Sequence, residues 1–318
     1  MSRVSIIVCA YTERRWADLL AAHASLAAQT RRPDQVVLVV DHNDALLRRA
    51  RTALPEVTVT ANAGAPGLSG ARNTGVEVAT GEVLLFLDDD AVADASWVQR
   101  MLEPFADPDV LGVGGWADPR WERPGRPAWF PEPFLWVVGC SYEGLPTSTA
   151  DVRNPLGCAM GFRRSAFDLV GGFSGLVGRI GGRPVGCEET EFAIRVLRAK
   201  PGARIVHNPA ARVAHHVTPD RARLSYFLRR CYHEGRSKAV LSADLGPRDS
   251  LASERDYVRR ILPRAAVRGV RRSVATGRPA GVASSLAILA GLGTTACGYG
   301  LARVQQRARV RRPAEAPV

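Results

Sequence analysis

The 318-residue sequence lacks paired cysteines. Its six cysteines form no CxxC pair and show no zinc-finger spacing, which favours small buried side chains in a reducing compartment over disulfides or a structural zinc ion. No secretory signal is visible either, because the N-terminal apolar run VSIIVCA is short and leads straight into the charged residues YTERR. We therefore expect the body of the protein to stay in the cytoplasm.

Acidic residues are absent between Arg259 and Arg312, a stretch that contains 12 arginines. The net charge of +12 is therefore a property of the C-terminal segment, and the rest of the chain is close to neutral. This distribution argues against a general nucleic-acid-binding face and favours a tail that meets an anionic surface. We predict no nucleic-acid partner.

Charge of either sign is absent from residues 281–302, and arginines flank this segment on both sides. The segment is long enough to cross a bilayer core, but many of its residues are Gly, Ala, Ser or Thr, so its insertion energy is marginal. A membrane span, a re-entrant or surface-lying helix and a buried soluble helix all stay open. The arginine-rich flanks favour contact with anionic lipid in the first two cases.

The first third of the chain alternates strand-like and helix-like patterns. Continuous apolar runs predict strands that are covered on both faces, and helical spacing appears between them. The alternation predicts an α/β fold with a parallel sheet and helices on both faces. The predicted strands are 4–11, 35–41, 56–62 and the run that ends at Asp88, and the predicted helices include 16–29 and 71–79.

Acidic residues follow three of these strands. Glu13, Asp41 and the triplet Asp88–Asp90 all come just after a strand, at the edge of the sheet where ligands gather. Carboxylates are costly to bury unpaired, so the triplet predicts a positive partner. Alternation along an extended chain lets Asp88 and Asp90 share one ion, while Asp89 faces the other way, toward a ribose or a neighbouring amide. The alternative is that the triplet only ends the strand and caps the next helix.

The middle of the chain carries weaker signals. Residues 110–150 are rich in Gly, Pro and Trp, and they predict an irregular segment that either walls a carbohydrate site or is a packed connection. Beyond them, 161–173 and 187–199 are short helical patterns around a glycine-rich loop at 171–186.

Taken in order, these blocks resemble the family 2 glycosyltransferases of GT-A fold. VSIIVCAYTERR resembles the first strand and nucleotide-contacting loop of the family, and VVDHND resembles the second, with Asp41 where the base is usually met. GLSGARNTGVEVATGEVLLFLDDDA resembles the Arg–Asn turn, the following helix and the DxD strand. GGF…GCEETEFAIR resembles the acceptor-side block, which the family writes with Glu-Asp and this chain with Glu188-Glu189. The similarity runs from about residue 3 to residue 240.

The resemblance implies a GT-A fold, a Rossmann-like and mostly parallel sheet flanked by helices, with a helical and basic C-terminal extension. It also implies three regions. Residues 1–110 would form the half that binds the nucleotide sugar, 111–240 the half that binds the acceptor, and 241–318 a basic helical region that can associate with a membrane.

The resemblance further implies a metal and a set of nucleotide contacts. Asp88 and Asp90 would hold Mg²⁺ or Mn²⁺ on the diphosphate of a sugar nucleotide, because such hard cations prefer carboxylate oxygens and keep places for phosphate. In several enzymes of this fold a late histidine completes the metal shell, so His215 or His216 could do so here, although a core or surface histidine is the commoner outcome. The residues expected to contact the donor are Glu13, Asp41, Arg72, Asn73 and Asp89.

Two further motifs are the glycine-rich turn before Arg72 and the acidic pair Glu188-Glu189. Glycines before Arg72 and Asn73 let backbone amides approach an anion at a helix start; the alternative is an ordinary turn with a solvated arginine. The family's catalytic base maps onto Glu189, whose arm is one methylene longer than the usual aspartate, and Glu188 flanks the site. An acidic cluster that merely complements a helix dipole is the alternative.

The segment RRCYHEGRSK (229–238) occupies the region where processive relatives carry a QxxRW signature, and we expect its Arg236 to contact the substrate. That signature is absent, which favours transfer of a single sugar over polymer synthesis.

These inferences predict an inverting, metal-dependent glycosyltransferase at the cytoplasmic face of the cell membrane, acting on a glycan or a polyprenyl-phosphate-linked acceptor. One alternative is a non-catalytic, membrane-bound protein that only binds sugar nucleotides. A second is a haloacid-dehalogenase-like phosphatase, because LLFLDDDAV also fits a DxDxV nucleophile motif. That class needs the motif on its first strand, a later lysine and a paired aspartate motif, whereas several strands precede it here and the only lysines are Lys200 and Lys238.

Overall fold

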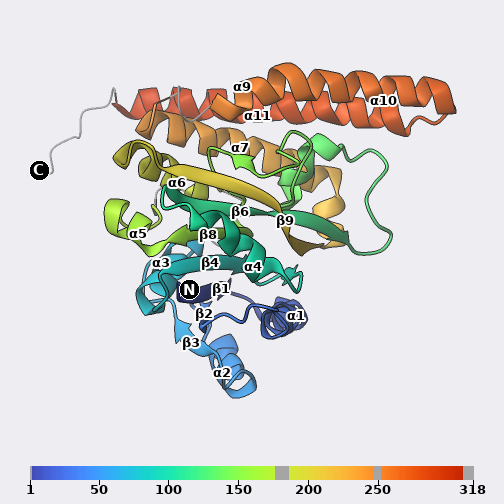
Figure 1. Ribbon diagram of the computed structural model, residues 1–318. Helices are drawn as coiled ribbons and strands as arrows, with labels where there is room; N and C mark the ends of the chain where they lie inside the picture. Colours follow the sequence, from blue (N-terminus) through green and yellow to red (C-terminus); the bar gives the residue numbers. More distant parts are fainter. Residues whose placement is uncertain (1, 176–185, 247–251, 311–318) are drawn as a thin grey trace, which may run out of the picture.

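The computed structural model describes residues 2–175, 186–246 and 252–310. Its centre is one sheet in the order β3-β2-β1-β4-β8-β6-β9-β5, with β7 paired to β9 beside this path. Helices cover both faces, and the C-terminal helices form a further layer at one end of the molecule (Figure 1). The interior of the predicted loop at 171–186 and the arginines at 311 and 312 lie outside the described residues.

The N-terminal half of the sheet has the predicted parallel order. Strand β1 pairs in parallel with both β2 and β4, and β2 pairs in parallel with β3. The sequence prediction of alternating strands and helices is confirmed here. The strands are β1 (Val4–Ala10), β2 (Gln35–Val40), β3 (Thr58–Ala61) and β4 (Val83–Asp88), and the connecting helices are η1 (Glu13–Arg15), α1 (Trp16–Ala27), α2 (Asp44–Ala53) and α3 (Leu68–Val78).

Beyond β4 the sheet is mixed. Strand β8 runs antiparallel to both β4 and β6, whereas β6 and β9 are parallel to each other. The short strands β5 and β7 are antiparallel to β9. The elements are β5 (Ala91–Ala93), α4 (Trp97–Leu102), η2 (Glu103–Ala106), β6 (Val110–Trp121), η3 (Glu132–Val138), β7 (Ala150–Asp151), β8 (Ala159–Arg163), α5 (Arg164–Val170), α6 (Glu188–Ala199) and β9 (Arg204–Val217).

The prediction of an irregular segment at 110–150 is wrong for its first part, which is the long strand β6. Its glycines resemble a loop signal in the sequence, but they have a packing reason. A Cβ on Gly112 would lie 2.7 Å from atoms of both Ile205 and Phe162. Glycine therefore lets β6 lie close to its neighbours, a role that local pattern cannot reveal.

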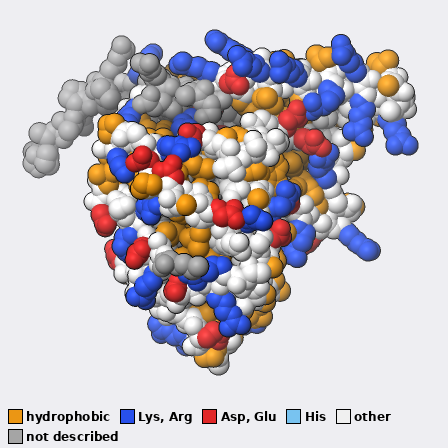
Figure 2. Space-filling view, viewed as in Figure 1, with side chains coloured by type: hydrophobic (Ala, Val, Ile, Leu, Met, Phe, Trp, Pro, Cys, Tyr) orange, Lys and Arg blue, Asp and Glu red, His pale blue; other side chains and the backbone are white. Residues whose placement is uncertain are grey.

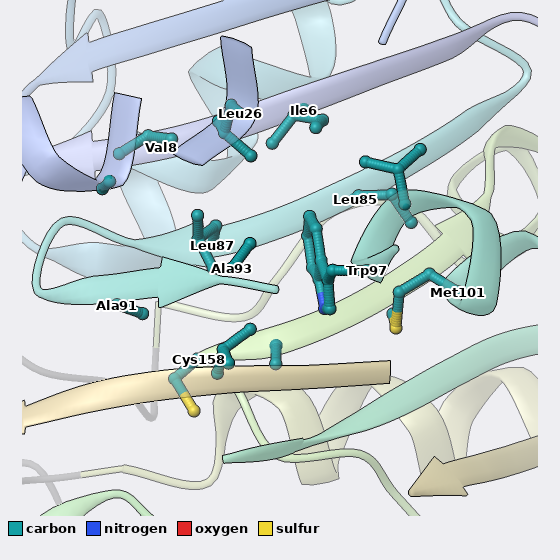
Figure 3. Packing of buried hydrophobic residues seen from close by; sticks show 14 of the residues in the cluster. Ile6, Val8, Leu26, Leu85, Leu87, Ala91, Ala93, Trp97, Met101 and Cys158 are labelled. Atoms are coloured by element: carbon teal, nitrogen blue, oxygen red, sulfur yellow. The ribbon is translucent and has the colours of Figure 1, made fainter. Parts of the chain in front are cut away.

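Two apolar layers cover the sheet. Along β4, Leu85 and Leu87 belong to one layer and Leu84 and Phe86 to the other, because successive side chains of a strand point to opposite faces. Figure 3 shows Trp97 of α4 among the residues of the first layer. The unbroken apolar runs in the sequence are thus explained by burial on both faces.

A third apolar cluster joins η3 to the C-terminal helices. It contains Phe134, Phe227 and Ile288, with Trp121, Trp129 and Trp136 packed against it. Three of the tryptophans of 110–150 therefore pack under these helices. The helices are η4 (Pro219–Ala222), α7 (Leu224–Asp244), α9 (Ala252–Asp256), the π-helical η5 (Tyr257–Ile261), α10 (Leu262–Thr276) and α11 (Ala280–Val310).

Candidate active site

A pocket opens at the carboxyl ends of β1, β2 and β4, beside the start of α3. Asp41, Asp88 and Asp89 line it together with Tyr11, Arg15 and Gly67, among others. Parallel strands bring their carboxyl ends to one edge, so acids that are distant in the sequence meet here as expected. The Asp41 carboxylate is held in place, since it accepts hydrogen bonds from the Asn62 amide at 2.6 Å and from the Gly67 backbone N–H at 2.9 Å.

The aspartate triplet divides in the way the alternation predicts. Asp88 and Asp90 face His215, whose Nε2 lies 4.0 Å from Asp88 Oδ2 and 3.2 Å from Asp90 Oδ1. Asp89 accepts a hydrogen bond from Arg15 Nη1 at 2.7 Å instead. One potential ligand atom from each of Asp88, Asp90 and His215 lies within 4.8 Å of the others.

Protein cations already surround the triplet. Arg15 Nη1 and Arg221 Nη2 each lie 3.1 Å from Asp90 Oδ2. Burial favours a neutral Asp90, but His215, Arg221 and Arg15 outweigh it and hold the pKa of Asp90 well below its usual range. Burial and the charge of Asp90 raise the pKa of Asp89 to about 7.

Sequence reasoning did not single out either arginine. Arg15 had a signal, since it lies in the loop directly after the first strand. Arg221 had none, because it lies 131 positions from the aspartate that it contacts and is brought there by η4 at the end of β9.

The residues at this point fit a divalent cation. Asp90 Oδ1 is buried and receives no hydrogen bond of acceptable geometry within the described part of the chain. Burial lowers the pKa of His215 but Asp90 outweighs it, raising that pKa to about 10, so a cation would take the place of the imidazolium proton. Two carboxylates and one imidazole form a donor set suited to Mg²⁺ or Mn²⁺, with Mn²⁺ favoured by the nitrogen.

The two histidines of β9 are not equivalent. His216 points to the opposite side of the strand from His215, where its ring nitrogens lie 2.8 Å from Asp18 Oδ1 and 2.6 Å from Glu122 Oε1. Of the two candidate histidines, His215 is the one that lies with Asp88 and Asp90. The ring of His216 lies beside Asp18 and Glu122 instead.

Arg72 connects Asp88 at the candidate cation site with Glu188 at the start of α6. It is buried in α3 and donates to Glu188 Oε1 at 2.9 Å, to the Gly157 carbonyl at 2.8 Å and to Asp88 Oδ1 at 3.5 Å. The alternative of a solvated arginine is therefore wrong. Glu188 Oε2 is buried and has no hydrogen-bond partner among the described residues.

Three residues that were expected to contact substrate are not among those that line the pocket. The Asn73 amide bonds the backbone of Phe173 in both directions, at 2.8 and 2.9 Å, so it fixes the turn at that position. Glu13 is exposed at the start of η1, and its neighbours Tyr11 and Arg15 line the pocket instead. Arg236 of α7 lies over the ring of Tyr232, 5.9 Å from the ring centre.

Glu189 is the second residue of α6, and it is half-buried. Burial and the neighbouring Glu188 raise the pKa of Glu189 to about 7. Cys187, just before the helix, has a positive φ of 81°, and its thiol donates to Glu234 of α7 at 3.4 Å. Glu234 is itself held by Arg230 at 2.8 Å, so α7 anchors the start of α6.

This sheet order, with an acidic cation site at the carboxyl edge of its parallel strands, defines a GT-A glycosyltransferase. The family model of Glycosyl transferase family 2 matches residues 5–171, and the chain belongs to this family. Its DxD motif begins at Asp88, the last residue of the fourth strand, β4. A haloacid-dehalogenase-like phosphatase needs its aspartate motif after the first strand, so this alternative is excluded.

Similar proteins support this assignment. The chain is 33% identical over 243 residues to a glucosyl-dolichyl phosphate glucuronosyltransferase of Haloferax volcanii, covering 75% of this chain and 77% of that protein. It is 27% identical over 250 residues to the succinoglycan biosynthesis protein ExoM of Rhizobium meliloti, covering 76% and 75% of the two chains. The fold is similar to a mannosyltransferase of Pyrobaculum calidifontis solved with GDP-Man and Mn²⁺, with a TM-score of 0.58, 19% identity and coverage of 92% and 87%.

Proposed function

We propose that this family 2 glycosyltransferase is an inverting, metal-dependent enzyme that moves one sugar from a nucleotide-diphosphate sugar to a hydroxyl of a glycan or a polyprenyl-phosphate-linked acceptor. The observation that carries the proposal is the position of Arg72, which contacts both Asp88 at the cation site and Glu188 beside the candidate base. Donor and acceptor groups thus belong to one site. We assign the donor half to residues 1–110, the acceptor half to 111–240 and the basic extension to 241–318.

Asp88, Asp90 and His215 would hold the cation. A bound Mg²⁺ or Mn²⁺ supplies neutralisation of the charge that develops on the departing diphosphate. The related mannosyltransferase was solved with Mn²⁺ and a sugar nucleotide, which supports this assignment. Arg15 keeps Asp89 and Asp90 oriented and adds a positive charge at the pocket wall.

On the donor side, Asp41 would meet the nucleotide base, and its orientation is fixed by the hydrogen bonds from Asn62 and Gly67. On the acceptor side, Glu189 would take the proton of the attacking hydroxyl. A carboxylate with a pKa near 7 is suited to this task, because it can accept a proton at neutral pH and still be partly ionised. Attack opposite the leaving diphosphate inverts the anomeric carbon.

The names of the relatives support the acceptor class. One is named for a glucosyl-dolichyl phosphate substrate and another for succinoglycan biosynthesis, so both a lipid-linked sugar and a surface glycan are consistent with this family. Either acceptor fits an enzyme at the cytoplasmic face of the cell membrane, where the chain would work as a peripheral protein or through its C-terminal segment.

The two histidines provide a matched test of the cation site. We expect His215→Ala to lower the affinity for Mn²⁺ by about tenfold or more, because it removes a ligand, whereas His216→Ala should change it by less than about twofold. Titration of free Mn²⁺ by electron paramagnetic resonance measures both. Equal losses in the two variants, or a loss only in His216→Ala, would contradict the assignment of His215.

The proposed reaction is tested by incubating the purified chain with Mn²⁺ and a panel of UDP-, GDP- and dTDP-sugars, with and without lipid-phosphate or glycan acceptors. Release of the nucleoside diphosphate, blocked by EDTA, is expected with at least one donor. Mass spectrometry of the product should show one added sugar, and nuclear magnetic resonance should show an inverted anomeric configuration. Binding of a sugar nucleotide with no turnover on any acceptor would instead support a non-catalytic binding protein.

A further inference from the structure

Exposed apolar side chains concentrate in the C-terminal helices. Among the described residues, nine of the 13 large hydrophobic side chains that are exposed lie between Val258 and Val304. Most belong to α10 and α11, which pack against each other and which we call the C-terminal hairpin (residues 262–310). Figure 1 shows that the hairpin lies along one end of the molecule, opposite α2.

The inward face of α11 is closely packed. A Cβ on Gly298 would lie 2.1 Å from the Tyr232 carbonyl of α7, and one on Gly281 would lie 2.1 Å from the Gly269 carbonyl of α10. Small residues thus allow the backbones to approach, and Ile288 joins the third apolar cluster. This face of α11 is an internal packing surface of the protein.

The outward face of α11 is apolar and unoccupied within the described structure. Leu286 and Leu289 are 60% and 61% exposed, and Val304 is 65% exposed. These residues recur at helical spacing with Val282 and Leu301, and no charged residue interrupts the helix between Arg278 and Arg303. A stripe of this length on a helix that is already packed on its other side needs a partner that accepts apolar side chains.

Several exposed arginines of the C-terminal helices have no carboxylate partner among the residues that the structure describes. Arg268 pairs with Glu143 and Arg260 with Asp256, but other exposed arginines of α10 and its neighbours have no ion pair within the described residues. Figure 2 shows the basic side chains gathered along the edge that these helices form. Among the described residues, these exposed and unpaired arginines include Arg264, Arg271, Arg272, Arg278 and Arg307.

We propose that the outward face of the C-terminal hairpin docks on a bilayer that contains anionic phospholipid, with α11 lying along the membrane surface. The apolar stripe would enter the interfacial region, and the unpaired arginines would meet the phosphate headgroups. The partner must supply both an apolar layer and negative charge, and an anionic bilayer supplies both.

Packing argues against a transmembrane position for α11. By length and composition the helix is able to cross a membrane. However, α10 is fastened along it, with the Ser285 hydroxyl donating to the Ala266 carbonyl at 2.7 Å. Crossing as a packed pair would take the arginines of α10 into hydrocarbon, which is costly. Crossing alone would uncover Phe134 and Phe227, which contact α11 at Gly291.

Docking in this orientation also places the acceptor side of the site near the bilayer, a consequence that rests on the proposed function. The hairpin covers α7, and Glu234 of α7 accepts the thiol hydrogen bond of Cys187 just before Glu189. A lipid-linked acceptor held in the same membrane would therefore reach the candidate base from the hairpin side.

The apolar part of the proposal is tested by sedimentation of the full chain with vesicles of phosphatidylcholine and phosphatidylglycerol. We expect the double variant Leu286→Glu, Leu289→Glu to lower vesicle binding by about tenfold or more. The matched control Leu20→Glu, Leu169→Glu changes two exposed leucines on α1 and α5 and should bind like the wild type. Equal binding by the two double variants would overturn the proposal.

The contribution of the arginines to binding is tested by a second double variant and its matched control. Arg271→Gln with Arg272→Gln should weaken binding to the anionic vesicles by about tenfold, while Arg48→Gln with Arg51→Gln, on α2 at the far end, should not. Wild-type binding should fall steeply with salt and be weak on pure phosphatidylcholine. Binding that is indifferent to lipid charge would also overturn the proposal.

The depth of α11 in the bilayer distinguishes docking on the membrane surface from crossing the membrane. Cys297 lies in α11 and is exposed, whereas the other cysteines are buried or half-buried, so a fluorescent thiol label can be directed to it. We expect quenching by headgroup-level probes and release of the protein by alkaline carbonate. Quenching at the bilayer centre, or resistance to carbonate, would show that α11 crosses the membrane. Donor hydrolysis in vesicle-free buffer is measured in parallel. This assay tests the proposed reaction even if the protein does not bind vesicles.

Discussion

Replacing Asp90 by asparagine should lower Mn²⁺-dependent donor turnover by about a hundredfold to a thousandfold. Asp90 offers a buried carboxylate oxygen toward Asp88 and His215, and an amide at this position is a much weaker ligand for a hard cation. The measurement is the rate of nucleoside diphosphate release at saturating Mn²⁺, accompanied by Mn²⁺ affinity. Both should fall together.

The structural consequence of this substitution needs its own control. Arg15, Arg221 and His215 all contact Asp90, so asparagine leaves buried cations less well compensated and should also lower thermal stability. Asp118→Asn, which breaks the exposed ion pair with Arg212, is the matched control and should retain turnover. If folded Asp90→Asn binds Mn²⁺ and turns over donor like the wild type, the cation site lies elsewhere.

The positive partner predicted for the triplet proves to be partly the protein itself. The sequence argument required a cation because three adjacent carboxylates repel, and the structure provides Arg15, Arg221 and the imidazole of His215. These groups offset the repulsion between the three carboxylates in the absence of a metal. Asp88, Asp90 and His215 would hold a divalent cation in a site that these contacts already orient.

The parallel N-terminal half of the sheet could be predicted from the sequence because its signals are local. Each buried parallel strand is a continuous apolar run, and an acid at the end of such a run must lie at the ligand-binding edge of the sheet. This reasoning placed Asp41, Asp88 and Asp89 in one pocket, as the structure has them. The family resemblance added roles to residues whose position was already constrained.

The features that sequence reasoning did not predict depend on contacts between residues that are distant in the sequence. Strand β6 is not predicted because Gly112 is required by its close packing against Phe162 and Ile205, which leaves no local signal. Asn73 is expected to contact the substrate, whereas its amide bonds Phe173, 100 positions away. The role of Arg72 as a bridge likewise depends on Glu188, 116 positions away. Such pairings are set by the tertiary fold, and no local pattern specifies them.

Glu189, where the family resemblance leads one to expect an aspartate, is the second residue of α6. Cys187 adopts a left-handed backbone conformation there, with φ of 81°, and is tied to Glu234 on α7. The turn at Cys187 therefore fixes the backbone position from which the Glu189 side chain extends.

Replacing Glu189 by glutamine should lower acceptor-dependent transfer by about a hundredfold to ten-thousandfold, because the amide cannot take the proton of the attacking hydroxyl. Donor and Mn²⁺ affinity should be nearly unchanged, since the cation site is formed by other residues. In the wild type, transfer should rise with pH through about 7 as Glu189 loses its proton. Glu189→Asp should retain this pH profile with a lower plateau. Turnover by the glutamine variant equal to that of the wild type would exclude Glu189 as the base.

Stability provides an independent check on the same carboxyl group. Burial and Glu188 raise its pKa from 4.5 to about 7 on folding, so between these values the folded state binds more protons than the unfolded state. The favourable contribution of protonated Glu189 is therefore present below pH 4.5 and is lost as pH rises through about 7. Glutamine cannot ionise, so the unfolding midpoint of Glu189→Gln should exceed that of the wild type at pH 8, and the difference should shrink toward pH 5. A variant that loses transfer but gains stability at alkaline pH identifies a group kept in an unfavourable environment for catalysis, whereas parallel losses of both would indicate that Glu189 serves only the fold.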